Sequence, residues 1–135
     1  MNLVFDIGYN VGEFSNECAR LYPGCKIVGV EANKNLVNSF NSKQQNQNIT
    51  LIHSLVSSEP NKEIDFFIEP HQTGISTASL NFLRNSRFTK GSKNLVKNSG
   101  KWSDAIKTRT TTLDNLIKYF GIPDLIKIDV EGYEE

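Results

Sequence analysis

Short hydrophobic runs and amphipathic segments alternate along the chain, and each change of pattern predicts a new strand or helix. The first three segments are a strand at residues 3–7, a helix at 12–21 and a strand at 26–30. Pro23 and Gly24 end the helix. Because the links are short, we expect a right-handed unit in which the two strands are parallel neighbours.

The same alternation continues along the rest of the chain. We expect a helix at 33–40 capped by Asn33, strands at 49–53 and 64–68, an edge strand at 107–112, a helix at 113–120 and a last strand from Asp124. The last helix and strand form another parallel crossover, which places that strand on the other side of the first one. The predicted fold class is therefore α/β, with a Rossmann-like, mostly parallel sheet and helices on both faces.

The segment at 71–104 follows neither pattern and is rich in Ser, Thr, Asn, Gly and Lys. Long irregular segments inside compact domains are usually either functional lids or disordered. We therefore expect a lid or substrate loop that carries Ser76, Ser79 and Trp102. Plain surface disorder explains the composition nearly as well.

Composition and charge narrow the class of protein. We expect the 135 residues to form one domain, 1–135. Because 15 Lys and Arg balance 15 Asp and Glu, the chain has no excess positive charge that would attract nucleic acid or an anionic membrane. No apolar run is long enough to cross a bilayer, and the start has no signal-peptide pattern, so we expect a cytoplasmic protein. Cys18 and Cys25 form no metal-like group, and we expect reduced packing residues.

A turn rich in glycine follows the first strand. Asp6, Gly8 and Gly12 precede a helix, whose free N–H groups attract an anionic group of a ligand. A dinucleotide fingerprint would need glycine where Asn10 and Glu13 stand, which argues against NAD. The spacing resembles the first turn of S-adenosylmethionine-dependent methyltransferases. The alternative is a turn that only packs the helix on the strand.

Two further segments should lie at the same edge of the sheet. Glu31 ends the second strand, 19 positions beyond Gly12, where mononucleotide-binding folds place an acid for ribose hydroxyls. A solvated glutamate is the alternative. Residues 54–57 should form a loop that faces the adenine ring, with Leu55 and Val56 giving apolar faces. His53 is expected to make a structural hydrogen bond.

The last strand delivers Asp129 and Glu131 to its carboxyl end, beside Asp6. A hydroxyl acceptor benefits from a general base, and Asp129 is the first catalytic candidate and Glu131 the second. An acid at a strand end can instead orient an ammonium group. No ligand spacing supports a metal.

Four motifs in order, VFDIGYNVGEFS, VGVEAN, TTTLDNL and LIKIDVEGYE, resemble the FkbM-type family of S-adenosylmethionine-dependent methyltransferases. This resemblance implies a class I methyltransferase domain that binds S-adenosylmethionine and methylates a hydroxyl of a small molecule or glycan. The methionine part would contact Asp6, Gly8, Asn10 and Gly12, the ribose Glu31, the adenine side Ser54 and Leu55, and the transferred methyl the region of Asp129. Tyr9 and Ala32 complete the cofactor-binding candidates.

The fold of that family continues beyond the last predicted strand, so we expect an incomplete, C-terminally truncated domain. Its last strand would be an exposed edge, with Lys127 at a position that otherwise faces neighbours. Self-association through this edge, or completion by a partner, is the expected consequence. The alternative to a working enzyme is a non-catalytic cofactor-binding remnant or half-domain.

Overall fold

The computed structural model describes residues 1–43, 46–67 and 105–129. The predicted lid at 71–104, with Ser76, Ser79 and Trp102, lies outside these residues.

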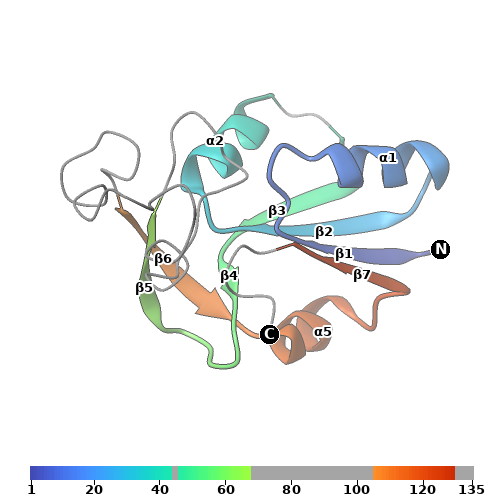
Figure 1. The fold of residues 1–135 in the computed structure, drawn as a ribbon. Coiled ribbons are helices and arrows are strands. Elements are labelled where there is room, and N and C mark those ends of the chain that lie inside the picture. The colour runs from blue at the N-terminus through green and yellow to red at the C-terminus, as the bar shows by residue number, and fades with distance from the viewer. Residues whose placement is uncertain (44–45, 68–104, 130–135) are drawn as a thin grey trace, which may run out of the picture.

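Four parallel strands form the main sheet in the order β3-β2-β1-β7 (Figure 1). They are β1 at Leu3–Ile7, β2 at Lys26–Glu31, β3 at Ile49–His53 and β7 at Leu125–Ile128. Because β1 lies between β2 and β7 and both faces of the sheet are covered, all its residues are buried. The predicted place of the last strand, beside the first and opposite the second, is confirmed.

Among the described residues, three helices cover the two faces of the main sheet. Helices α1 at Glu13–Leu21 and α2 at Lys34–Lys43 lie on one face, and α5 at Leu113–Phe120 lies on the other (Figure 1). The predicted cap of α2 is confirmed, because Asn33 Oδ1 accepts a hydrogen bond from Asn35 N at 3.0 Å.

Successive residues of β1 pack into different cores. Leu3, Phe5 and Ile7 belong to the core that also contains Leu116 of α5. Val4 belongs to the core under α1 and α2. Since side chains alternate along a strand, the polar Asp6 shares the face of Val4 and points toward α1. This alternation buries an acid beneath the first turn of α1.

A second sheet contains β4 at Leu55–Val56, β5 at Glu63–Phe67 and β6 at Ala105–Thr111, in the order β4-β6-β5. The prediction of an edge strand near 107–112 is wrong, because β6 pairs with β4 on one side and β5 on the other. Its polar sequence suggested an edge, but Thr108 and Thr110 are buried with hydroxyls that donate to backbone carbonyls. A threonine that satisfies its hydroxyl is compatible with a central strand. The α/β class and the mostly parallel, Rossmann-like sheet are confirmed.

Candidate functional site

The carboxyl ends of the parallel strands bring the candidate residues to one edge of the main sheet. Ile7 pairs with Val30 on one side and Ile128 on the other. The residues that follow these partners are Glu31 and Asp129, and Asp129 N donates to Ile7 O at 2.8 Å. The turn after β1 is therefore flanked by one acid from each neighbouring strand.

Three left-handed residues shape the turn between β1 and α1. Gly8, Asn10 and Gly12 have φ values of 88°, 57° and 88°. Asparagine tolerates this conformation better than most side chains, which explains why it can stand between the two glycines. Gly8 N and Tyr9 N both donate to Val30 O, at 2.8 and 3.1 Å, and fix the turn against β2.

The Tyr9 side chain packs where two glycines leave room. A Cβ on Gly12 would lie 2.3 Å from Tyr9 Oη, and one on Gly29 would lie 2.8 Å from Tyr9 Cδ2. The ring also meets Phe40 edge to face, with 5.7 Å between centroids, and Tyr9 is buried. Tyr9 therefore anchors the turn to the core beneath α1 and α2.

Glu31 links the turns after β1 and β2. Its Oε1 accepts from Asn10 N and its Oε2 accepts from Asn33 N, both at 2.7 Å. Burial raises the pKa of Glu31, and the N–H donors of Asn33, Asn10 and Ala32 oppose that rise. The alternative interpretation, in which Glu31 is exposed to solvent, is therefore wrong. Each carboxylate oxygen has two acceptor positions, so capacity remains for hydroxyl donors of a ligand.

Two side chains hold the backbone next to Glu31. His53 Nε2 lies 3.0 Å from Ala32 O, and Thr108 Oγ1 donates to the same carbonyl at 3.1 Å. His53 makes the structural hydrogen bond that the sequence led us to expect. The Ala32 side chain is buried, so Ala32 could contact a ligand only through its backbone.

The segment after β3 differs from the predicted loop. Ser54 is buried and its Oγ donates to Arg109 O at 2.7 Å. Leu55 lies in β4, pairs with Thr110 of β6 and is 2% exposed in the core. The expectation that the Leu55 side chain offers an apolar face to a ligand is therefore wrong. A strand of two residues is too short to show a pattern in the sequence.

Asp6 is the most deeply buried acid of the site. The residue is fully buried, and Ser15 Oγ donates to its Oδ2 at 2.6 Å. Lys127 Nζ lies 3.3 Å from its Oδ1, yet this oxygen lacks a well-aligned hydrogen-bond donor among the described residues. Burial raises the pKa of Asp6, while Ser15 and Lys127 lower it.

Asp129 lies at the open side of the edge, with its side chain 68% exposed and its Oδ2 3.9 Å from Lys127 Nζ. Exposure makes this carboxylate accessible to an acceptor molecule. Glu131, the second catalytic candidate, lies outside the described residues.

The expectation that Lys127 faces neighbours beyond the edge strand is wrong. Its Nζ donates to Gly8 O at 3.3 Å and lies over the Phe14 ring, 5.7 Å from the centroid. The sequence held a signal for this contact. Lys127 is the one charged residue in Leu125–Ile128, and alternation puts it on the same face as Asp129.

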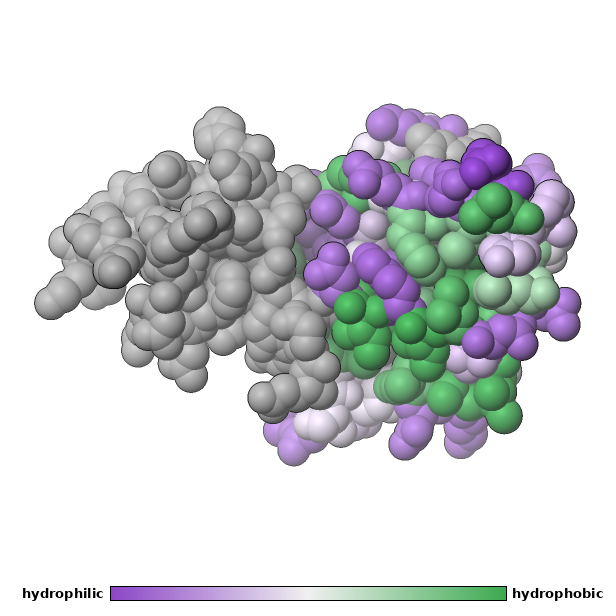
Figure 2. Space-filling view, turned by 45° about the vertical axis from the view of Figure 1, so that its right-hand side comes forward, coloured by the Kyte–Doolittle hydropathy of each residue, from purple (hydrophilic) through white to green (hydrophobic). Residues whose placement is uncertain are grey.

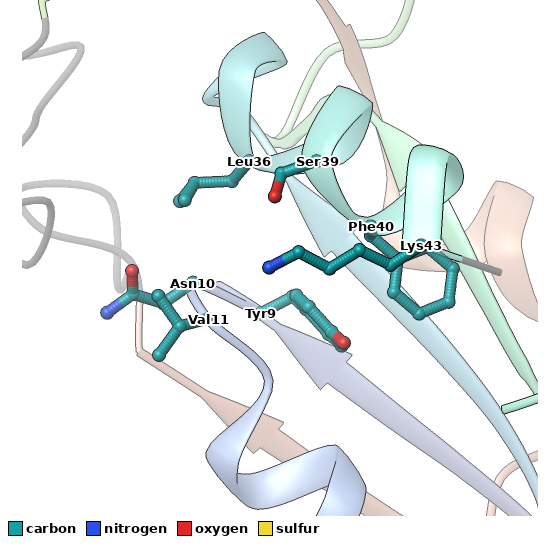
Figure 3. Close-up of a pocket in the computed structure, with 7 residues that line it drawn as sticks. All are labelled: Tyr9, Asn10, Val11, Leu36, Ser39, Phe40 and Lys43. Atoms are coloured by element: carbon teal, nitrogen blue, oxygen red, sulfur yellow. The ribbon is translucent and has the colours of Figure 1, made fainter. Parts of the chain in front are cut away.

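A pocket opens beside the turn, between it and α2. Figure 3 shows Lys43 extending from α2 across this space toward the turn. Its lining residues are Tyr9, Asn10, Val11, Leu36, Ser39, Phe40 and Lys43. Only Tyr9 and Asn10 of these are candidate site residues, so the pocket borders the acidic edge without including its carboxylates.

The residues fit a ligand that carries hydrogen-bond donors and positive charge. Asp6 Oδ1 lacks an aligned donor, and Glu31 has acceptor capacity left. In the part of the chain that is described, no three His, Cys, Asp or Glu side chains group as metal ligands. No helix within the described ranges has the length and hydrophobicity needed to cross a membrane.

The sequence model of the methyltransferase FkbM domain matches residues 6–135. The match includes every candidate residue from Asp6 to Glu131. No curated protein and no solved structure matches the chain.

Proposed function

Because the chain belongs to the FkbM methyltransferase family, we propose that it transfers a methyl group from S-adenosylmethionine to a hydroxyl group of a small molecule or glycan. The observation that carries this proposal is the arrangement at the carboxyl edge. A left-handed turn and acids from three adjacent strands meet there, with Glu31 buried and already oriented by backbone N–H groups.

Each part of the cofactor has a fitting group in the chain. Glu31 would accept hydrogen bonds from the ribose hydroxyls. The backbone of Gly8, Asn10 and Gly12 would contact the methionine part, close to the N-terminus of α1. Asp6 and Asp129, offset by the ammonium of Lys127, leave an excess of negative charge that favours the cationic end of the ligand.

The segment after β3 stays our candidate for the adenine side. With the Leu55 side chain in the core, contacts there would come from the backbone of Ser54 and Leu55 and from the half-buried Val56. Backbone groups at a strand end are well placed to recognise a flat ring by hydrogen bonding.

Bound S-adenosylmethionine would supply an activated methyl group on a sulfonium sulfur. The chain would then act mainly by alignment, since holding two reactants in place lowers the barrier substantially. Asp129 is the first candidate to accept the proton of the acceptor hydroxyl, because it is exposed at the same edge, and Glu131 is the second.

Calorimetric titration with S-adenosylmethionine and S-adenosylhomocysteine tests the proposal. We expect the wild-type chain to bind both, and Glu31→Gln to bind at least about tenfold more weakly, since a lost hydrogen bond to a charged group costs roughly 1.5–3 kcal/mol. Glu17→Gln is the matched control, because Glu17 is exposed on α1 and pairs only with Arg20 among the contacts described. A folded wild-type chain that binds neither ligand would refute the proposal.

A second candidate function is a cofactor-binding module that needs another polypeptide for catalysis. The exposed side of β7 favours it, because no strand of the described residues pairs there. Cofactor binding without transfer of a labelled methyl group to hydroxylated acceptors would support this candidate over the first. A cytoplasmic location stays a prediction from the sequence.

A further inference from the structure

Lys127 occupies a central position among the polar groups of the carboxyl edge. It pairs in register with Asp6 across β7 and β1. Its Nζ lies 3.3 Å from Asp6 Oδ1, 3.3 Å from Gly8 O and 3.9 Å from Asp129 Oδ2. One ammonium group therefore contacts the strand β1, the turn that follows it and the end of β7.

These contacts differ from those of an ordinary surface lysine. The Lys127 side chain is 28% exposed, and its partner Asp6 is fully buried. An uncompensated charge is costly at such a position, whereas most exposed ion pairs contribute little. Ser15 offers Asp6 one hydrogen bond but no charge. Lys127 is the cation that lies within 4 Å of this carboxylate among the described residues.

We propose that Lys127 is a positioning residue for the cofactor site: its ammonium ties the turn after β1 to the end of β7 and stabilises the charged form of the Asp6 carboxylate. This inference rests on the proposed function, because Asp6 and the Gly8 turn are the groups expected to contact the methionine part. Lys127 acts through Asp6 and Gly8 and need not contact the cofactor itself.

Other titratable groups around Asp6 work against its ionisation. Burial is the largest cause of the raised pKa of Asp6, and Asp129 at the end of β7 adds to it. Burial also raises the pKa values of Tyr9, Cys18 and Glu31, and the charge of Asp6 adds to each of them. Lys127 on β7 has the opposite effect and lowers the pKa of Asp6. Without it, burial and Asp129 would favour the protonated, neutral form of Asp6.

The test compares Lys127→Met with Lys127→Arg, which keeps the charge. Two readouts are needed: NMR titration of the Asp6 side-chain carboxyl, and affinity for S-adenosylhomocysteine between about pH 4.5 and 8, a range that covers raised carboxyl pKa values. Lys107→Met is the matched control, because Lys107 forms an exposed ion pair with Asp65 between β6 and β5 of the second sheet.

In Lys127→Met we expect the Asp6 titration, and with it the acid limb of the affinity profile, to move up by about one to three pH units. Lys127→Arg should stay close to the wild type, and Lys107→Met should match it. Unchanged Asp6 titration and an unchanged affinity profile in a folded Lys127→Met chain would overturn the proposal. Equal loss of affinity at every pH with an unchanged Asp6 titration would also overturn it, since that outcome shows that Lys127 does not act through the Asp6 carboxylate.

Two further outcomes remain informative. If Lys127→Met does not fold, the double variant Asp6→Asn with Lys127→Met should restore folding, because the uncompensated charge is gone. Failure of the double variant to fold would count against the proposal. If the wild type does not bind S-adenosylhomocysteine, the proposed function fails, while the Asp6 titration still decides the role of Lys127.

Discussion

At the scale of single residues, the site consists of buried acids whose neighbours compensate for burial. Glu31 is oriented by backbone N–H groups from two turns, and Asp6 by a serine and a lysine. Such groups cost stability when they ionise and are retained where their charge is useful. Both acids should therefore make the stability of the fold depend on pH.

The stability of the wild-type chain should fall relative to Glu31→Gln as the pH rises above about 4.5. The pKa of Glu31 in the folded chain is raised above its ordinary value of 4.5, so folding favours the protonated form. This contribution is fully present below the unfolded pKa and is lost as the pH rises through the folded pKa. Each pKa unit corresponds to about 1.4 kcal/mol.

Urea unfolding of both chains from pH 3.5 to 7, about the range in which carboxyl groups titrate, would measure this difference. Glu17→Gln is again the control, since the pKa of Glu17 is lowered by its hydrogen bond to Arg20 and should give the opposite trend. A constant difference between wild type and Glu31→Gln at every pH would contradict the prediction.

At the scale of elements, the turn after β1 shows what the sequence could predict. Gly8, Gly12 and Glu31 were identifiable because strand ends, glycine spacing and an acid at a fixed interval are local patterns. The contacts of Lys127 and Thr108 were not predicted, because each joins residues more than 70 positions apart. For Lys127, the alternation along β7 was a local signal that was not used. The interior position of β6 was missed for the same reason, because only the folded chain shows which carbonyls accept from its threonines.

Gly12→Ala should destabilise the chain more than Gly24→Ala. The two residues have nearly the same left-handed backbone, with φ values of 88° and 89°, which costs alanine about 1–2 kcal/mol in either case. A Cβ on Gly12 also meets the Tyr9 ring, whereas nothing lies within 4 Å of one on Gly24. Overpacking adds roughly 1–3 kcal/mol, so the difference in the free energy of unfolding should have about that size.

Chemical denaturation of the two variants beside the wild type would test this expectation. Gly12→Ala should also weaken cofactor binding, because the turn shifts with Tyr9, while Gly24→Ala should bind normally. Equal destabilisation of the two variants would show that the Tyr9 ring moves aside freely and does not anchor the turn.

At the scale of the whole molecule, the main sheet has two edges at which no described strand pairs, β3 and β7. Exposed large hydrophobic side chains lie in β7 but not in β3. The face seen in Figure 2 carries a large hydrophobic area. Exposed hydrophobic side chains in and before β7 are Tyr119, Ile122, Leu125 and Ile128. Hydrophobic surface next to an unpaired strand edge is typical of an interaction site.

We therefore expect the chain to self-associate through β7, with an apparent mass that rises with concentration in sedimentation velocity. Leu125→Lys should suppress the association, because a charge on an edge strand disfavours pairing with a second strand. Leu21→Lys is the control, since Leu21 is equally an exposed leucine but lies on helix α1, which covers a face of the sheet and is not part of the β7 edge. A wild-type chain that remains monomeric at all concentrations would contradict the prediction. Equal suppression by both variants would place the contact away from β7.

Because Lys127 lies in the same strand, association that buries β7 should also shield the Lys127 contacts from solvent. Cofactor affinity should therefore rise with chain concentration in the wild type but not in Leu125→Lys.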